Sequence, residues 1–292
     1  MSVTQIEQAL IVEDAVSDSE SPIMRIRAVR PWMWSDVKEL WDYRDLLSTL
    51  AMRDLKLRYR QTALGVLWVL FQPLAGAGIF SIVFGRVAGL SGEGYSYFIF
   101  SLSGLLVWNA FQSTLSKAST VLISNGALVS KVYFPRLLLP LSTLLSTLVD
   151  FLVGLCAFVV IALSSGWMPT WTVLQLPLWL GLSLGMAVGS GLIAASLMTR
   201  FRDVQHVLPM LLPFLMYATP VAYGMTAVPA DYKNLFDFNP MAWVVEGARN
   251  AFLGRAFVPL GWFVYAIAFT LLVLVLGVVC FRRMERNLAD VL

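Results

Sequence analysis

Charged residues are scarce in this chain. They make up 13% of its 292 residues, whereas hydrophobic residues make up 58%. A typical soluble domain contains about 25% charged residues. A soluble protein of this length needs more polar surface than that. The composition therefore excludes an ordinary soluble fold and predicts an all-α protein that crosses a membrane several times.

Histidine and cysteine are nearly absent. His206 is the single histidine, and Cys156 and Cys280 are the only cysteines. Both cysteines lie in apolar runs, where packing explains them better than a disulfide framework does. So few nitrogen and sulfur ligands exclude a rich metal cluster. A carboxylate-only site stays open but has no support, so we expect no bound metal.

The chain also lacks the usual nucleotide-hydrolysis signature. The phosphate-binding motif GxxxxGK[ST] cannot occur, because no glycine is followed by lysine. We therefore expect the chain not to be an enzyme by itself.

Charge inside the apolar runs is rare as well. Asp150 is the clearest case, and an acid at membrane depth is by default a functional residue. No cation lies near it in the sequence, so its partner stays open. Carriers driven by protons or sodium usually need more buried charge than this, which weakens that class of function.

The first 24 residues contain five acids and no lysine or arginine, the reverse of a secretory signal. We expect residues 1–34 to form an acidic, mobile tail in the cytoplasm.

A basic segment runs directly into an apolar one at Arg53–Pro73, RDLKLRYRQTALGVLWVLFQP. Arginine keeps its charge, so the first half of this segment must stay at water or lipid headgroups. The apolar half begins a stretch that is long enough to cross a bilayer. This junction therefore marks a membrane boundary.

Six apolar segments are long enough to cross as helices, which satisfy their own backbone hydrogen bonds in lipid. They are residues 62–85, 95–117, 136–163, 173–198, 205–224 and 261–281. The fourth segment carries closely spaced glycines, so we expect it to pack inside the bundle. These are Gly181, Gly185, Gly189 and Gly191.

The distribution of positive charge predicts the orientation. With six spans, 17 of the 21 lysines and arginines fall on the side of both termini and the remaining four on the other. The positive-inside rule then places both termini in the cytoplasm.

Residues 35–60 are expected to form an amphipathic helix. Leu40, Tyr43, Leu47 and Leu50 repeat at helical spacing. The helix either lies on the inner leaflet or docks a partner. The competing interpretation, a basic flank that orients the first span, explains the charges but not the apolar stripe.

A long inner connection, Lys117–Arg136, offers a second candidate for contact with a partner. Asn125 and Gly126 favour a turn or a helix start, after which four residues form an apolar face that Pro135 ends. These four are Leu128, Val129, Val132 and Tyr133. The face suits a partner's groove or, equally, covers the end of the bundle. In the short loop 199–205, Arg202 either fixes topology or contacts a partner.

The outer connection contains a further amphipathic helix. Pro240 suits its start and Gly254 its end, and it is too short to span, so we expect a re-entrant helix. Glu246 and Arg249 stand three residues apart. They either form a gate at the exit or an exposed ion pair of little energetic value.

Aromatic residues are abundant, and some have positions suited to lining a transport path for sugar rings. These are Trp108, Phe111, Tyr217, Tyr223 and Trp243. For each of them, packing is the stronger interpretation.

Three motifs together resemble the membrane subunit of type 2 ABC exporters. They are RDLKLRYRQTALGVLWVLFQP at Arg53–Pro73, SKVYFPR at Ser130–Arg136 and the NP…EGAR segment of Asn239–Arg249. The resemblance covers residues 35–292, and the most similar branch exports O-antigen, capsule and teichoic-acid polysaccharides. Rival functions are an ABC exporter of a small drug or lipid, and a membrane scaffold or lipid-modifying enzyme.

The resemblance implies partners that the chain itself does not contain. Such permeases form homodimers with two copies of a separate ATPase subunit, which binds ATP and Mg²⁺, so no cofactor is expected on this chain. A lipid-linked glycan passes between the two permeases of a bacterial inner membrane, and no nucleic acid is involved. The residues expected to couple to the ATPase are Arg53, Lys56, Arg58, Asn125, Leu128, Val129, Lys131, Val132, Tyr133, Phe134 and Arg202.

Overall fold

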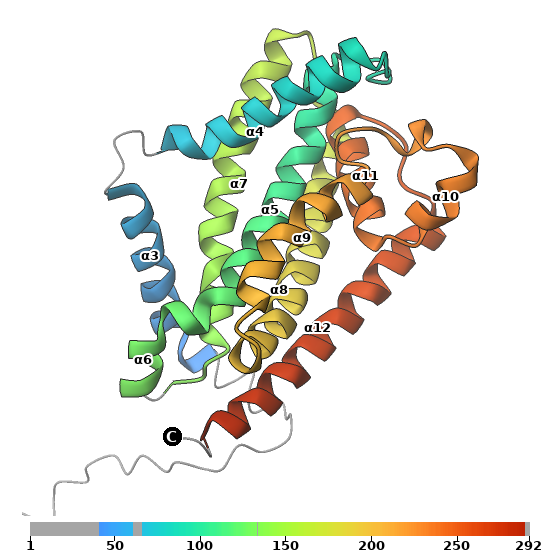
Figure 1. Cartoon of the computed structure of the whole chain (residues 1–292). Coiled ribbons are helices and arrows are strands. Elements are labelled where there is room, and N and C mark those ends of the chain that lie inside the picture. The colour runs from blue at the N-terminus through green and yellow to red at the C-terminus, as the bar shows by residue number, and fades with distance from the viewer. Residues whose placement is uncertain (1–40, 61–65, 133, 290–292) are drawn as a thin grey trace, which may run out of the picture. The chain divides into compact units, whose positions relative to one another are not determined.

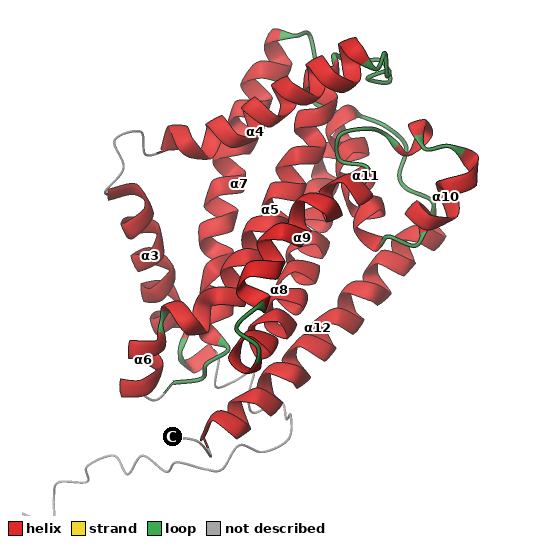
Figure 2. Ribbon diagram, viewed as in Figure 1, coloured by secondary structure: helices red, strands yellow, loops and turns green. Residues whose placement is uncertain are grey.

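The computed structural model describes residues 41–60, 66–132 and 134–289, so the predicted tail 1–34 lies outside the described residues. All described residues fall within one compact unit, Val37–Leu292. Helices joined by loops make up this described part, and it contains no strand (Figures 1 and 2). The prediction of an all-α membrane protein is confirmed.

The helices follow one another along the chain in this order: α3 (Arg44–Arg60), α4 (Val66–Phe80), the π-helix η1 (Ser81–Val87), α5 (Tyr97–Ser124), α6 (Gly126–Lys131), α7 (Leu138–Ser164), the 3₁₀ helix η2 (Trp171–Gln175), α8 (Leu176–Arg200), α9 (Val204–Ala218), the 3₁₀ helix η3 (Met225–Ala227), α10 (Ala230–Asp237), α11 (Pro240–Leu253) and α12 (Leu260–Ala289).

Five segments are long and apolar enough to cross a membrane. They are Leu67–Val87, Tyr97–Ser124, Leu138–Ser164, Trp171–Arg200 and Leu260–Glu285. The remaining predicted span, 205–224, corresponds to α9, which has 15 residues. At 1.5 Å per residue α9 is about 22 Å long, shorter than the ~30 Å hydrocarbon core. It ends at Ala218 because Thr219, which precedes Pro220, takes an extended conformation.

The second span is longer than the sequence indicated. We expected it to end at Lys117, but α5 continues to Ser124. Lys117 therefore lies about two helical turns inside the helix and not in the connecting loop.

α5 and α8 form the centre of the bundle. Both bury most of their length, and Trp108 on α5 and Trp179 on α8 are among the largest fully buried side chains. α8 packs against α5 on one side and α12 on another, while α4 crosses α5 and α7 (Figure 1).

Glycines permit the close packing of α8, as the sequence predicted. A Cβ atom at Gly189 would lie 2.7 Å from the backbone of Val273 on α12, and one at Gly191 would lie 2.7 Å from Ala118 on α5. Gly277 faces Gly189 from α12, so the two backbones are in contact there. Gly181, by contrast, has open space beside it.

The apolar stripe of α3 packs against the protein's own chain. Leu50 and Ala51 are buried, and Leu50 shares a cluster with Phe134 and Leu138 at the start of α7. These two residues of α3 are therefore covered by the protein itself, and the placement of the helix on the inner leaflet or against a partner stays a prediction. Apolar periodicity identifies a covered face but not what covers it.

Candidate functional site

α3 and α6 lie together at one end of the bundle, which we call the α3–α6 end (Figure 1). Arg53 on α3 donates a hydrogen bond from Nη2 to Oδ1 of Asn125, over 2.7 Å. The same nitrogen lies 2.9 Å from Oδ1 of Asp54. Arg53 and Asn125 were both predicted to couple to an ATPase subunit, and the structure joins them directly.

The predicted apolar face that follows Asn125 is divided between inside and outside. Leu128 and Val129 are partly buried against the cluster formed by α3, α5 and α7. Lys131 is exposed, and Val132 is 53% exposed. Tyr133 lies outside the described residues. The face thus both covers the end of the bundle and presents an exposed edge.

Phe134 is buried at this end of the bundle. Its side chain is 5% exposed and packs with Leu138 and Leu139. Its burial holds the segment in place, and its role in coupling to an ATPase subunit stays a prediction.

The other predicted coupling residues are found at the surface. Lys56 on α3 is exposed, and Arg202 is exposed in the short turn between α8 and α9. The side chain of Arg58 lies outside the described part.

The end of α12 reaches this same end of the bundle. Arg136, just before α7, lies 3.8 Å from Glu285 near the end of α12 (Nε to Oε1). Basic residues that the sequence placed on the inner side therefore gather here.

Asp150 has a cationic neighbour that the sequence did not reveal. Nζ of Lys117 lies 3.4 Å from Oδ2 of Asp150, and it also donates hydrogen bonds to Ser146, at 3.0 Å, and Thr147, at 3.4 Å. Ser146, Thr147 and Asp150 share one face of α7 because they are spaced at three and four residues. The pairing depends on the extension of α5 past Lys117 and on the packing of α5 against α7.

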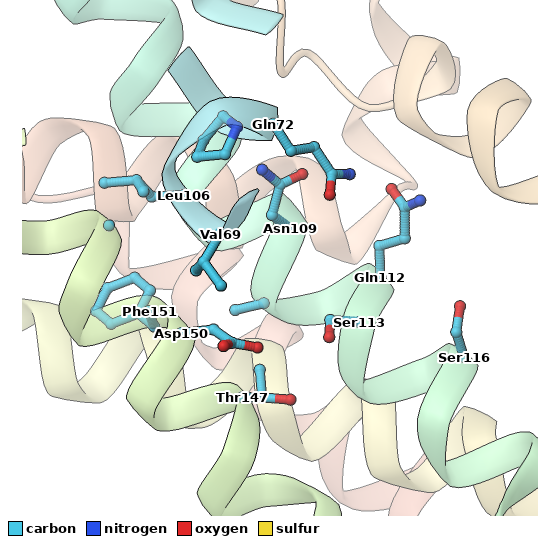
Figure 3. A pocket seen from close by; sticks show the side chains of 13 residues that line it. Val69, Gln72, Leu106, Asn109, Gln112, Ser113, Ser116, Thr147, Asp150 and Phe151 are labelled. Carbon is cyan, nitrogen blue, oxygen red and sulfur yellow. The ribbon is translucent and has the colours of Figure 1, made fainter. Parts of the chain in front are cut away.

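Asp150 also lines a recess between α4, α5 and α7, about 210 Å³ in volume (Figure 3). We call it the α4–α5–α7 recess. Seven of its lining residues carry polar side chains: Gln72, Asn109, Gln112, Ser113, Ser116, Thr147 and Asp150. Polar side chains concentrated among apolar helices need water or another polar molecule in the recess, because hydrocarbon cannot form hydrogen bonds with them.

The five predicted path aromatics do not form one wall. Trp108 is 1% exposed and Phe111 is 8% exposed; their rings lie against each other with centroids 5.3 Å apart. Trp108 donates a hydrogen bond to Oε1 of Gln112, over 3.0 Å, so it supports a recess residue from behind. Both rings are packed in the structure, and a role for either in the transport path stays a prediction.

The other three aromatics lie at or near the opposite end. Trp243 on α11 is buried and stacks on Trp262, with ring centroids 4.8 Å apart. Tyr217 on α9 is half exposed, and its carbonyl accepts a hydrogen bond from the Tyr223 hydroxyl at 2.6 Å. Tyr217 has the most accessible ring of the five.

The opposite end of the bundle contains α10 and α11, and we call it the α10–α11 end (Figure 1). α11 begins at Pro240 and ends at Leu253, where Gly254 caps it as predicted, in the left-handed conformation that glycine favours. Asn239 caps its first turn by accepting from the backbone N–H of Met241. Most of α11 is buried against α5, α8 and α12.

Arg249 on α11 is fully buried, so the interpretation of an exposed ion pair is wrong. Its Nη1 lies 2.8 Å from Oε2 of Glu246. Its Nη2 donates to the carbonyls of Pro220, at 2.9 Å, and Val221, at 2.8 Å. The guanidinium also lies over the Phe100 ring, 4.2 Å from the centroid. Arg249 thus fastens the segment after α9 to α11 and α5.

The buried charge of Arg249 is compensated locally. Burial lowers the pKa of its guanidinium, and the Glu246 carboxylate opposes that shift. Gly104 on α5 makes room for this group, because a Cβ there would lie 2.7 Å from Nη2 of Arg249. A gate formed by Glu246 and Arg249 stays a prediction.

A second ion pair lies near it that the sequence analysis missed. Arg255, just after α11, pairs with Glu93 in the loop before α5 and donates to the Glu93 carbonyl at 2.8 Å. Thr226 donates a hydrogen bond to the same carboxylate. The residues are 162 positions apart, so no local pattern indicates the contact.

Residues Gly181–Gly185 read GLSLG and match the G-x-S-x-G pattern of serine hydrolases. Ser183 lies within α8, fully buried, and its hydroxyl donates to the carbonyl of Val107 at 3.3 Å. A nucleophile in that motif needs a strand-to-helix turn that exposes it. The match is therefore not a nucleophile elbow.

Comparison with known proteins gives the family. A family model for the ABC-2 type transporter matches residues 45–253. The O-antigen export system permease protein RfbA of Myxococcus xanthus is 31% identical over 218 residues, which are 74% of this chain and 83% of the relative. RfbA of Klebsiella pneumoniae is 27% identical over 254 residues, covering 85% and 95%.

The polysialic acid transport protein KpsM of Escherichia coli is 26% identical over 245 residues, 82% of this chain and 93% of the relative. The matched region, 45–253, runs from the start of α3 to the end of α11 and so includes the α3–α6 end, the recess and Arg249. The chain belongs to the ABC-2 type transporter family.

Proposed function

We propose that this chain is the permease subunit of an ATP-driven exporter that moves a lipid-linked polysaccharide out of the cytoplasm across the inner membrane of a bacterium. The observation that carries the proposal is the match to O-antigen export permeases over 83–95% of their length. ATP is hydrolysed by a separate subunit, and the permease acts as a homodimer with two copies of that ATPase, with both termini in the cytoplasm.

The α3–α6 end supports an ATPase-docking role. Lys131 and Val132 form an exposed edge at the end of α6. Lys56 and Arg202, on other segments that the charge distribution assigned to the inner side, are exposed as well. A partner that pushes on α6 would act on α3 through the Arg53–Asn125 hydrogen bond.

The packing of α3 offers a route from that end to the recess. Leu50 of α3 shares a cluster with Leu138 and Leu139 at the start of α7. α7 carries Asp150 and Thr147 to the wall of the α4–α5–α7 recess. A displacement of α3 would thus shift one wall of the recess relative to α4 and α5. In this way ATP binding by the partner changes a polar space within the membrane.

The proposal is tested by deleting the gene and following the glycan. If the chain is the exporter, the deletion strain should accumulate the glycan on its lipid carrier inside the cell and lose it from the surface. Plasmid-borne wild-type permease should restore surface glycan, and the Lys131→Glu variant should restore it only weakly while inserting normally. Unchanged surface glycan in the deletion strain contradicts the proposal.

A further inference from the structure

Several polar groups in the α4–α5–α7 recess lack protein partners. Within the part of the chain that the structure describes, the amides of Gln72 and Asn109 and the hydroxyl of Ser113 make no hydrogen bond. Gln112 uses its Oε1 to accept from Trp108, which leaves its amide N–H groups for the recess. Figure 3 shows side chains from α4, α5 and α7 surrounding one space. In lipid, such groups need a polar occupant.

The size of the recess limits that occupant. About 210 Å³ holds about seven waters at roughly 30 Å³ each. Pockets for drug-sized ligands measure about 300–1,000 Å³. The recess therefore suits a single small ring better than a drug-sized molecule or a stretch of oligosaccharide.

The chemistry of the lining matches a hydroxylated ring. Amide and hydroxyl side chains both donate and accept hydrogen bonds, as sugar hydroxyls do. Phe151 and Leu106 supply an apolar part of the wall, which suits the C–H face of such a ring. The lining thus offers polar groups for the hydroxyls of a sugar ring and apolar groups for its C–H face.

The charge of the lining favours a neutral ring. Among the described lining residues, Asp150 is the one that carries a charge, and it is negative. The nearby cation, Lys117, is bound to Asp150, Ser146 and Thr147 and is not among the lining residues. A carboxylate on the ring would face Asp150 without a cation in the lining to compensate it.

We propose that the α4–α5–α7 recess binds one uncharged sugar ring of the exported glycan and discriminates against acidic sugars. This inference rests on the proposed function for the origin of the ring. It assigns a substrate class to the chain: a glycan whose recognised units are neutral.

The test uses a cysteine placed in the recess. Ser113→Cys is made in a permease that also carries Cys156→Ala and Cys280→Ala, purified with its ATPase subunit in lipid nanodiscs. A small charged thiosulfonate reagent reports access from water. Leu152→Cys is the matched control in the same background. Leu152 is on α7 but is 55% exposed on the outside of the bundle, away from the recess lining, where lipid would cover it. We expect Ser113→Cys to react at least about 10-fold faster, because the recess is hydrated.

Two probes with the same ring then test the chemistry: methyl glucoside, which is neutral, and methyl glucuronide, which carries a carboxylate. We expect methyl glucoside to slow labelling of Ser113→Cys at least about 3-fold and methyl glucuronide to leave it unchanged. Adding Asn109→Leu should remove the protection while labelling continues. Adding Asp150→Asn should allow the glucuronide to protect as well.

Three results would overturn the inference: labelling no faster than at Leu152→Cys, equal protection by both probes, or no protection by methyl glucoside. Because these measurements need no export, their failure is separate from failure of the proposed function, which the deletion strain reports. Protection in the labelling assay combined with normal surface glycan in the deletion strain would keep the recess and reject the export role.

Discussion

Replacing the buried Arg249 by leucine should destabilise the α10–α11 end strongly. The change removes the 2.8 Å ion pair with Glu246 and the hydrogen bonds to the carbonyls of Pro220 and Val221. Glu246, 12% exposed, would keep a charge without this partner. Breaking a buried pair by removing one member costs about 3–5 kcal/mol.

This free energy converts into a measurable shift in melting temperature. For domains of about 150–250 residues, 1 kcal/mol corresponds to roughly 2–4 °C. We therefore expect the Tm of the purified permease to fall by about 6–20 °C in Arg249→Leu, followed by tryptophan fluorescence in one fixed detergent. Gly104→Ala should lower the Tm in the same direction, because its Cβ would lie 2.7 Å from Nη2 of Arg249.

A matched control separates this effect from the general loss of an arginine. Arg86 is exposed in η1, seven residues before Glu93, and forms no ion pair within the described residues, so Arg86→Leu should leave the Tm unchanged. The double variant Arg249→Leu with Glu246→Leu should recover part of the loss, because it removes the unpaired carboxylate. A Tm for Arg249→Leu as close to wild type as that of Arg86→Leu would refute the reasoning.

Three further predictions follow from other contacts. Arg53→Met should lower export at least about 3-fold per assembled complex, because it removes the 2.7 Å link to Asn125, whereas Arg44→Met, on an exposed residue of the same helix, should not; equal export in a surface-glycan assay would reject the coupling role. Lys117→Met should cost about 1–3 kcal/mol by removing the cation 3.4 Å from Asp150, and Asp150→Asn added to it should restore stability; a Tm equal to wild type in the single variant would contradict this. Gly277→Val should abolish the folded yield, because a Cβ there would lie 2.4 Å from the Gly189 carbonyl oxygen, while Gly181→Val, with open space, should be tolerated in size-exclusion profiles; equal yields would disprove the contact.

The sequence predicted the fold class and much of the helix pattern because those depend on local chemistry. Apolar length identifies a span, proline and glycine identify the two ends of α11, and glycine spacing identified α8 as a packed helix. Each of these signals lies within about 25 neighbouring residues, so it can be read from the sequence without knowledge of the tertiary contacts.

The contacts that build the candidate site were harder to predict because they join distant segments. Lys117 and Asp150 are 33 residues apart, and their pairing depends on where α5 ends. Arg249 looked like one half of an exposed i,i+3 pair, since its sequence neighbours do not reveal the carbonyls of Pro220 and Val221. For α3, periodicity indicated an apolar face, but only the packed structure shows that α5 and α7 cover it.

Transport by a reconstituted complex tests the central claim most directly. The permease and its ATPase subunit are placed in liposomes that carry a lipid-linked neutral glycan on the outer leaflet, where the ATPase domains also face outward. We predict that ATP with Mg²⁺ moves the glycan into the lumen, where added glycosidase no longer reaches it, and that ATP does nothing when the permease is omitted. Glycan that stays accessible to glycosidase while ATP is hydrolysed would contradict the account.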